Sequence, residues 1–235
     1  MVDTQIRPSD VTKFPIIDAF LSIPREKFVP DGKREAAYIG ENFQIGQSRV
    51  ILDPRTLAKL LEALDVQKDE LVLDIGTGLG YSSAIISLIA ELVIAVEEDS
   101  NLTSEAEEIL SEIGADNVVV QLGKLEDGAA EHGPYDVIIL QGGVEEIPGS
   151  ILKQLKNGGR VGAIFVEEGL GTAKIGFKLK DKINIAPGIE NIFKAFEYCS
   201  FKDTKVVIFG QDPYFQPGVA LSLIHISEPT RQAEM

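Results

Sequence analysis

Residues 71–81 read LVLDIGTGLGY, and this stretch decides the fold. The mostly apolar run from Leu71 to Ile75 is typical of a buried β-strand. Gly76, Gly78 and Gly80 follow it at every second position, and the apolar residues beyond them indicate a helix. Glycines at such a turn let the backbone bend tightly and let a ligand approach the main chain closely.

Strand-like and helix-like segments alternate from residue 70 onward. The predicted strands are 70–76, 91–99, 117–123, 135–143 and 160–168, and the predicted helices between them are 81–90, 102–114 and 148–159. Continuous apolar strands that alternate with helices are typical of a parallel sheet covered on both faces. We therefore predict an α/β fold with an open, doubly wound, mostly parallel sheet of at least five strands. Ligands in such sheets bind at the carboxyl ends of the strands.

The first 68 residues form a different kind of region. Amphipathic segments around Phe14 to Leu21 and from Pro54 to Leu64 predict helices, so we expect a helical N-terminal extension. The chain of 235 residues suits one α/β domain with an appendage. We divide it into an N-terminal region (1–68), a cofactor-binding domain (69–177) and a tail of two segments (178–220 and 221–235).

Composition narrows the class of function. The chain contains one cysteine and two histidines, so we expect no metal site. It has no run of about 18 apolar residues and no apolar signal-peptide segment, which predicts a cytoplasmic protein without a membrane span.

Charge is distributed unevenly. The formal net charge of −15 arises within residues 1–177, which hold 15 basic and 30 acidic residues, whereas residues 178–235 hold seven of each. Nucleic-acid phosphates would be repelled by so acidic a chain, so we expect a protein or small-ligand partner and no nucleic acid.

Two carboxylates accompany the glycine-rich turn. Asp74 lies near the end of an apolar strand, where burial without donors would be costly. Glu97 ends the next strand, 23 residues later, where an acidic side chain can accept the two hydroxyls of a ribose. The spacing G-x-G-x-G differs from the G-x-G-x-x-G of dinucleotide-binding enzymes, so the pattern favours another nucleoside cofactor.

The segment LDIGTGLGYSSA resembles the cofactor motif of class I S-adenosylmethionine-dependent methyltransferases. Five other segments resemble, in order, those of the protein-L-isoaspartate O-methyltransferase family within it: MVDTQIRP, IPREKFVP, AAYIGENFQIGQ, GPYDVIIL and QLKNGGRVGAI. The resemblance spans about residues 1–175 and implies a Rossmann-like fold, S-adenosylmethionine as cofactor and a protein or peptide carboxylate as methyl acceptor.

The resemblance also implies which residues hold the cofactor. In the first loop they are Asp74, Gly76, Thr77, Gly78, Gly80 and Tyr81, and Glu97 holds the ribose. After the third strand, Lys124 stands where the family has an aspartate that faces adenine, and Leu125 could line the adenine pocket. Gln141, at the end of the fourth strand, is our candidate for a cofactor or acceptor contact.

The acceptor side departs from the family pattern. Val50 and Leu52 occupy the positions of the threonine and serine that clamp the isoaspartyl carboxylate in the family. Aliphatic side chains cannot orient a carboxylate, so isoaspartyl specificity is open to question. Ser48 or Arg49 could substitute, and Tyr38 could border the acceptor site.

The tail carries a second resemblance. Residues 182–220, with KVVIFGQDPY, resemble a fragment of a uracil-DNA glycosylase, which would give Asp212 and Tyr214 catalytic roles. Phe215 replaces a histidine there, and the segment is too short for that fold, so we expect a poorly packed, inactive fragment. Residues 221–235 resemble the translation of a sequencing adapter, an artefactual end.

The sequence therefore predicts a carboxyl methyltransferase in residues 1–177. A non-catalytic module that binds S-adenosylmethionine is the alternative, and uracil-DNA glycosylase activity is a remote one.

Overall fold

The computed structural model of the chain describes residues 1–46, 49–167, 169–179 and 182–186. The chain divides into two compact units, Met1–Ile183 and Asn184–Met235. The predicted N-terminal region and cofactor-binding domain both lie within the first unit. The predictions for the tail, including Asp212 and Tyr214, fall almost entirely outside the described residues.

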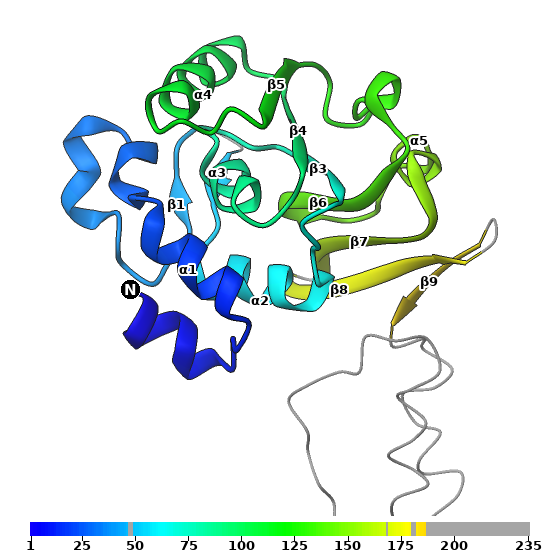
Figure 1. Cartoon of the computed structure of the whole chain (residues 1–235), viewed down its shortest axis with the longest axis horizontal. Helices are drawn as coiled ribbons and strands as arrows, with labels where there is room; N and C mark the ends of the chain where they lie inside the picture. Colours follow the sequence, from blue (N-terminus) through cyan, green and yellow to red (C-terminus); the bar gives the residue numbers. More distant parts are fainter. Residues whose placement is uncertain (47–48, 168, 180–181, 187–235) are drawn as a thin grey trace, which may run out of the picture. The chain divides into compact units, whose positions relative to one another are not determined.

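The described residues form a seven-stranded sheet, of which β3 to β8 lie within the first unit (Figure 1). Its strands are β3 (Leu71–Ile75), β4 (Leu92–Glu97), β5 (Val118–Leu122), β6 (Tyr135–Val144), β7 (Leu155–Glu167), β8 (Leu170–Leu179) and β9 (Lys182–Ala186). Their spatial order is β5-β4-β3-β6-β7-β8-β9. The first five are mutually parallel, and β8 is antiparallel to β7. The order reverses direction between β3 and β6, which confirms the predicted doubly wound, mostly parallel sheet.

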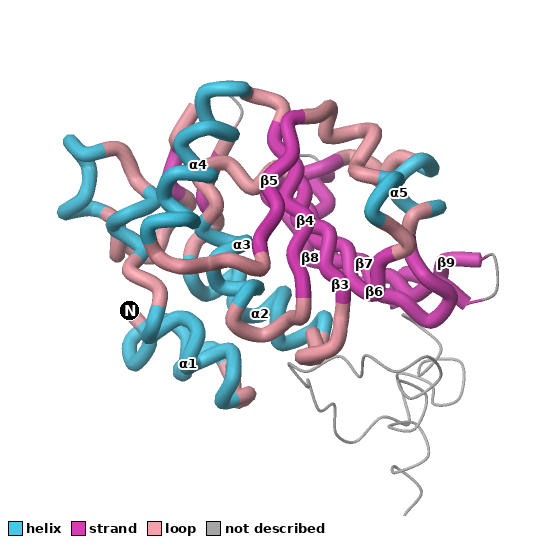
Figure 2. Tube along the Cα trace, turned by 45° about the horizontal axis from the view of Figure 1, so that its top comes forward, coloured by secondary structure: helices cyan, strands magenta, loops and turns pink. Residues whose placement is uncertain are grey.

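Helices lie on both faces of this sheet, and the principal ones are α1 (Phe14–Ser22), α2 (Pro54–Leu64), α3 (Tyr81–Ser87), α4 (Ser100–Glu112) and α5 (Gly149–Lys153). Figure 2 shows α1 to α4 on one side of the sheet and α5 on the other. The helix α3 packs against β3 and β4, and α2 packs against β7, whereas α5 packs against β7 from the opposite face.

The N-terminal region is mainly helical, as predicted. Besides α1 and α2 it contains short 3-10 or π-helical segments at Val2–Ile6, Arg7–Ser9, Arg25–Phe28 and Asp31–Ala36; a further 3-10 turn, Ala130–His132, lies in the sheet domain. Asp53 begins α2, because its carboxylate accepts a hydrogen bond from the backbone N–H of Thr56 at 3.0 Å and Pro54 takes the first helical position. The sequence did not predict the small antiparallel hairpin of β1 (Phe43–Gln44) and β2 (Val50–Ile51).

The core under α5 shows why the strands are so apolar. Leu73, Ile94 and Ile138 are buried on the same face as Ile151 of α5. The intervening residues of β3 face the other way, toward α3, so both sides of each central strand are covered. Asp74 belongs to this second set, which places a carboxylate beneath the helix that follows the glycine turn.

The structure differs from the prediction most clearly at the end of one helix and in an additional strand. The helix predicted for 148–159 ends at Lys153, because Leu155 already pairs with Tyr135 in the sheet and β7 has begun. The strand β8 was not predicted at all, and it extends the sheet by pairing antiparallel with β7 along Leu170–Phe177.

Candidate active site

Asp74 is fully buried, and side-chain donors surround its carboxylate. The hydroxyls of Ser82 and Ser83, in the first turn of α3, each donate to Oδ2 at 2.6 Å. The Gln141 amide donates to Oδ1 from Nε2 at 2.7 Å. Burial raises the pKa of Asp74, and these hydrogen bonds oppose that rise. These three donors satisfy the hydrogen-bonding capacity of the buried carboxylate, whose burial would otherwise be costly. They also link β3 to α3 and to β6.

Gln141 reaches Asp74 because β6 is irregular at that point. Three residues of β6, Leu140 to Gly142, lie opposite the single residue Ala163 of β7. Such a bulge redirects a side chain out of the regular alternation of a strand. Since an ionised carboxylate only accepts hydrogen bonds, the amide nitrogen of Gln141 must face Asp74, and its oxygen is left as an acceptor beside the pocket.

The glycine turn brings its bare backbone close to its neighbours. Gly76 and Gly78 have φ angles of +80° and +59°, which side chains other than glycine rarely adopt. A Cβ on Gly76 would lie 3.3 Å from the carbonyl oxygen of Gln141, and one on Gly78 would lie 2.6 Å from Cδ1 of Ile45. Leu125 lies beside Gly76 as well, so the predicted adenine-side residue is adjacent to the turn.

Glu97 ends β4 beside this turn, and it is fully buried. Its carboxylate accepts hydrogen bonds from the backbone N–H groups of Gly78 at 3.0 Å, Glu98 at 2.9 Å and Asp99 at 3.1 Å. Arg49 completes the set, because its Nε lies 2.9 Å and 3.1 Å from the two Glu97 oxygens. Arg49 is thus bound to the predicted ribose residue in this structure.

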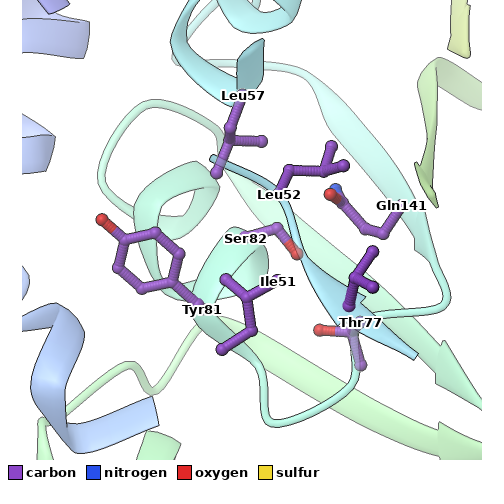
Figure 3. A pocket seen from close by; sticks show the side chains of 8 residues that line it. Ile51, Leu52, Leu57, Thr77, Tyr81, Ser82 and Gln141 are labelled. Carbon is purple, nitrogen blue, oxygen red and sulfur yellow. The ribbon is translucent and has the colours of Figure 1, made fainter. Parts of the chain in front are cut away.

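A small pocket lies between the turn and the β2 segment (Figure 3). Its lining consists of Val50, Ile51, Leu52, Leu57, Thr77, Tyr81, Ser82 and Gln141. Its volume of about 10 Å³ is about the least that can hold one water molecule. The side chains of β2 and its flanks therefore cover the first cofactor loop closely.

Tyr81 faces both this pocket and the N-terminal region. Its ring contacts Phe20 and Phe28 edge-on, at centroid distances of 6.3 Å and 5.4 Å, and the Arg25 guanidinium lies 4.7 Å from its centroid. Figure 3 shows the hydroxyl directed away from Gln141. Burial raises the pKa of Tyr81 to about 12. Tyr81 thus anchors the N-terminal region onto α3, a role the sequence did not indicate.

Arg25 is a second residue that the sequence did not single out. It is fully buried, donating from Nε to the Ala37 carbonyl at 2.8 Å and from NH2 to the Leu52 carbonyl at 2.9 Å. Among the described residues, neither its NH1 nor the Tyr81 hydroxyl has a hydrogen-bond partner. Burial lowers the pKa of Arg25. The guanidinium thereby fixes the backbone of Leu52, a residue that the family pattern places at the acceptor.

The remaining predicted acceptor residues are less central. Ser48 lies outside the described residues. Tyr38 is 41% exposed and does not line the pocket; its hydroxyl donates to the Glu26 carboxylate. Burial and this bond raise the pKa of Tyr38 to about 12.

Two further observations concern other classes of site. No group of three or more His, Cys, Asp or Glu side chains within the described residues could hold a metal ion. No helix in the same part of the chain is long and apolar enough to cross a membrane.

The residues of the site fit S-adenosylmethionine. A buried carboxylate at the end of β4, a glycine turn after β3 and an apolar side chain at Leu125 form the arrangement that a ribose, an amino-acid moiety and an adenine require. The obstacle to that fit is Arg49, which takes up acceptor positions of Glu97.

Comparison with known proteins agrees with this geometry. Residues 1–186 match the model of the family Protein-L-isoaspartate(D-aspartate) O-methyltransferase (PCMT), which extends past the predicted limit of about 175. A protein-L-isoaspartate O-methyltransferase of Syntrophus aciditrophicus is 37% identical over 161 residues, 68% of this chain and 74% of its own length. One of Dictyoglomus turgidum is 39% identical over 144 residues, 61% of this chain and 66% of its own length.

Solved structures show the same fold. A protein-L-isoaspartate O-methyltransferase superposes with a TM-score of 0.66 at 29% identity, over 73% of this chain, which spans only 57% of that chain's length. A Plasmodium falciparum protein described as a putative protein-L-isoaspartate O-methyltransferase in complex with S-adenosyl-L-homocysteine has a TM-score of 0.65 at 18% identity, covering 76% of this chain and 88% of its own. The sheet order, the glycine turn and the family match lead to one conclusion: this chain belongs to the protein-L-isoaspartate (D-aspartate) O-methyltransferase family of S-adenosylmethionine-dependent methyltransferases.

Proposed function

We propose that this chain transfers a methyl group from S-adenosylmethionine to a side-chain carboxylate of a protein or peptide. The observation that carries the proposal is the meeting of the Gly76–Gly80 turn and the Glu97 carboxylate at the carboxyl ends of β3 and β4. Glu97 and the turn would hold the ribose and the amino-acid moiety, and Leu125 would line the adenine side. When bound, the cofactor supplies an electrophilic methyl group on a sulfonium.

The protein's own task in this reaction is chiefly orientation. A carboxylate is already ionised at neutral pH, so no general base is required. The acceptor oxygen must be held in line with the bond that breaks, and water must be excluded. The aliphatic residues Val50, Ile51 and Leu52 suit water exclusion. The Gln141 amide oxygen, fixed by the bond of its nitrogen to Asp74, can accept a hydrogen bond and so suits a cofactor contact.

We further propose a cytoplasmic protein that acts on protein or peptide acceptors and does not bind nucleic acid. The net charge of −15 supports the last point. An isoaspartyl side chain is the acceptor that the relatives' names suggest. Val50 and Leu52 lack the hydroxyls that clamp this acceptor in the family pattern. Whether the chain methylates an isoaspartyl peptide is therefore the first question to test.

A second candidate function is cofactor binding without catalysis. It is favoured by the same aliphatic residues at the acceptor side, together with a cofactor loop that keeps its glycines and Glu97 but has Lys124 in place of the adenine-facing aspartate. The two functions differ in one outcome, since only the enzyme labels an acceptor.

The test has two stages, both with the full-length chain. Calorimetric titration with S-adenosyl-L-homocysteine should give saturable binding, and Glu97→Ala should weaken that binding at least tenfold. Absence of saturable heat with the wild-type chain would exclude the cofactor assignment. Incubation with methyl-labelled cofactor and an isoaspartyl peptide should then yield a base-labile labelled ester, with the matched aspartyl peptide as control. Cofactor binding without any labelling would favour the non-catalytic module.

A further inference from the structure

Arg49 connects the acceptor segment to the cofactor side. Its backbone carbonyl accepts from the N–H groups of Ile45 and Gly46, at 3.0 Å and 3.3 Å, which holds it in the hairpin of β1 and β2. Its guanidinium reaches Glu97 and also donates from NH2 to Oε1 of Glu98 at 2.7 Å. The Arg49 side chain is 12% exposed. Although burial alone would lower the pKa of Arg49, the bonds and charge of Glu97 and Glu98 raise it overall.

The Glu97 carboxylate has no acceptor position to spare while Arg49 is bound. An ionised carboxylate offers about four lone-pair sites. Three backbone N–H groups and the single N–H of Arg49 Nε, which is shared between the two Glu97 oxygens, already occupy them. The backbone donors are fixed by the fold, since they belong to the glycine turn and to the start of α4. Ribose hydroxyls can therefore donate to Glu97 only after the Arg49 side chain moves.

A displaced Arg49 remains at the acceptor site, because it immediately precedes Val50, which lines the pocket. The pocket otherwise has few donors for a carboxylate. Val50 and Leu52 have none, the Ser82 hydroxyl and the Gln141 amide are bound to Asp74, and the Thr77 hydroxyl is bound to Ser83. The Tyr81 hydroxyl points away from Gln141 (Figure 3). A guanidinium binds carboxylates with two parallel hydrogen bonds, which also fixes the orientation of the oxygens.

We propose that Arg49 exchanges between two carboxylates: it holds Glu97 until the cofactor ribose displaces it, and then binds the carboxylate of the methyl acceptor. The inference rests on the proposed function for its acceptor half. It makes Arg49 the specificity-determining residue that replaces the missing hydroxyls. It also makes binding ordered, with cofactor first.

The exchange predicts opposite effects of one substitution on the two ligands. In Arg49→Gln the competitor of the ribose is lost, so S-adenosyl-L-homocysteine should bind about tenfold more tightly, the scale of a hydrogen bond to a charged group. The same variant should raise KM for the isoaspartyl peptide about tenfold or more. A merely structural role of Arg49 would weaken both ligands together.

Glu98→Gln separates the two halves of the proposal. This substitution removes the charge of Glu98 that pairs with Arg49 but leaves the guanidinium in place. S-adenosyl-L-homocysteine should therefore bind about twofold to threefold more tightly, while KM for the peptide stays unchanged. Arg55→Gln is the matched control, since Arg55 is nearby, carries the same charge and is 63% exposed. It should change neither value.

Calorimetric titration with S-adenosyl-L-homocysteine and steady-state kinetics with the isoaspartyl peptide are measured for all four proteins, each first shown to be folded by thermal unfolding. Weaker or unchanged analogue binding by Arg49→Gln would overturn the exchange. Tighter analogue binding with unchanged KM for the peptide would overturn the acceptor half. These outcomes are distinct from failure of the proposed function, in which the wild-type chain itself neither binds the analogue nor labels the peptide.

Discussion

The turn after β3 and the strand β2 line the same pocket with opposite chemistry. On the cofactor side, Asp74 is buried with every oxygen engaged by Ser82, Ser83 or Gln141. On the acceptor side, Val50 and Leu52 present only hydrocarbon. The first side requires each donor to be in place, because a buried carboxylate that loses partners is destabilised. The second side tolerates exchange of side chains, because apolar contacts are not directional. Cofactor chemistry is thus rigidly specified, and acceptor chemistry is open to variation.

The largest loss of stability is expected for Arg25, whose guanidinium contacts both Leu52 on the acceptor side and Tyr81 on the cofactor side. Arg25→Met removes the donors to the Ala37 and Leu52 carbonyls and the stack on Tyr81, leaving two buried carbonyls without partners. We expect a loss of about 3 to 5 kcal/mol in the free energy of unfolding. Chemical denaturation followed by circular dichroism measures it, with the exposed Arg55→Met as control. A loss below 1 kcal/mol would show that the two sides are held together by other contacts.

The cofactor side alone is tested by Asp74→Asn. Asparagine offers one acceptor oxygen to the three donors, and its own amide hydrogens face them. The free energy of unfolding should fall by about 2 kcal/mol, and binding of S-adenosyl-L-homocysteine should weaken at least tenfold. Asp116→Asn, at an exposed position, should leave both values unchanged. If Asp74→Asn binds the analogue as well as the wild-type chain does, the cofactor side is less strictly specified than we infer.

The chemistry of the acceptor side is tested by Val50→Thr, which restores one hydroxyl at nearly constant volume. One additional hydrogen bond contributes about 1 kcal/mol, so kcat/KM for an isoaspartyl peptide should rise about fivefold. Steady-state kinetics with the peptide gives the value. Val119→Thr, on the exposed strand β5, is the matched control. A decrease for Val50→Thr would indicate that the apolar surface itself selects the acceptor.

The smallest effect is expected for Tyr81→Phe, which removes a buried hydroxyl without a partner among the described residues. The unfolding free energy should rise by about 1 kcal/mol or less at neutral pH, and analogue binding should be unchanged. The pKa of Tyr81 is raised to about 12, above the value near 10 of an exposed tyrosine. Because burial disfavours the phenolate, the unfolded chain loses the Tyr81 proton near pH 10 and the folded chain only near pH 12, so wild-type stability falls as pH rises from 10 toward 12. Wild-type stability should fall more steeply than that of the variant across this window, measured by thermal unfolding at each pH.

The sequence predicted the strands β3 to β7 because each is an apolar run between helix or turn signals. It missed β8, whose apolar residues are separated by glycines and lysines and which is defined by pairing with β7. The helix predicted across Leu155 fails for a related reason, since pairing with Tyr135 outweighs local helical pattern.

The site shows the same difference between features set by local sequence and features set by contacts between distant residues. Motif spacing pointed to the glycine turn, Asp74 and Glu97 as candidates, because these are close in sequence or end consecutive strands. The pair of Arg49 and Glu97 joins residues 48 positions apart, and no periodicity indicates it. Ser82 and Ser83 gave one usable signal, since two hydroxyls in the first turn after a glycine loop are suited to donate to a buried carboxylate. The contacts of Arg25 with Leu52 and Tyr81 depend on how the N-terminal region packs, which local sequence does not encode.

The bulge in β6 has a consequence for how this site can change over evolutionary time. Leu140 to Gly142 are not in one-to-one register with β7, so the strand regains its pairing at Gly143 whatever side chain position 141 carries. A substitution there changes the group presented to the pocket without shifting the register of the sheet, but it must keep a donor to the buried Asp74 carboxylate. The bulge thus restricts evolutionary change at position 141 to side chains that can still donate to Asp74.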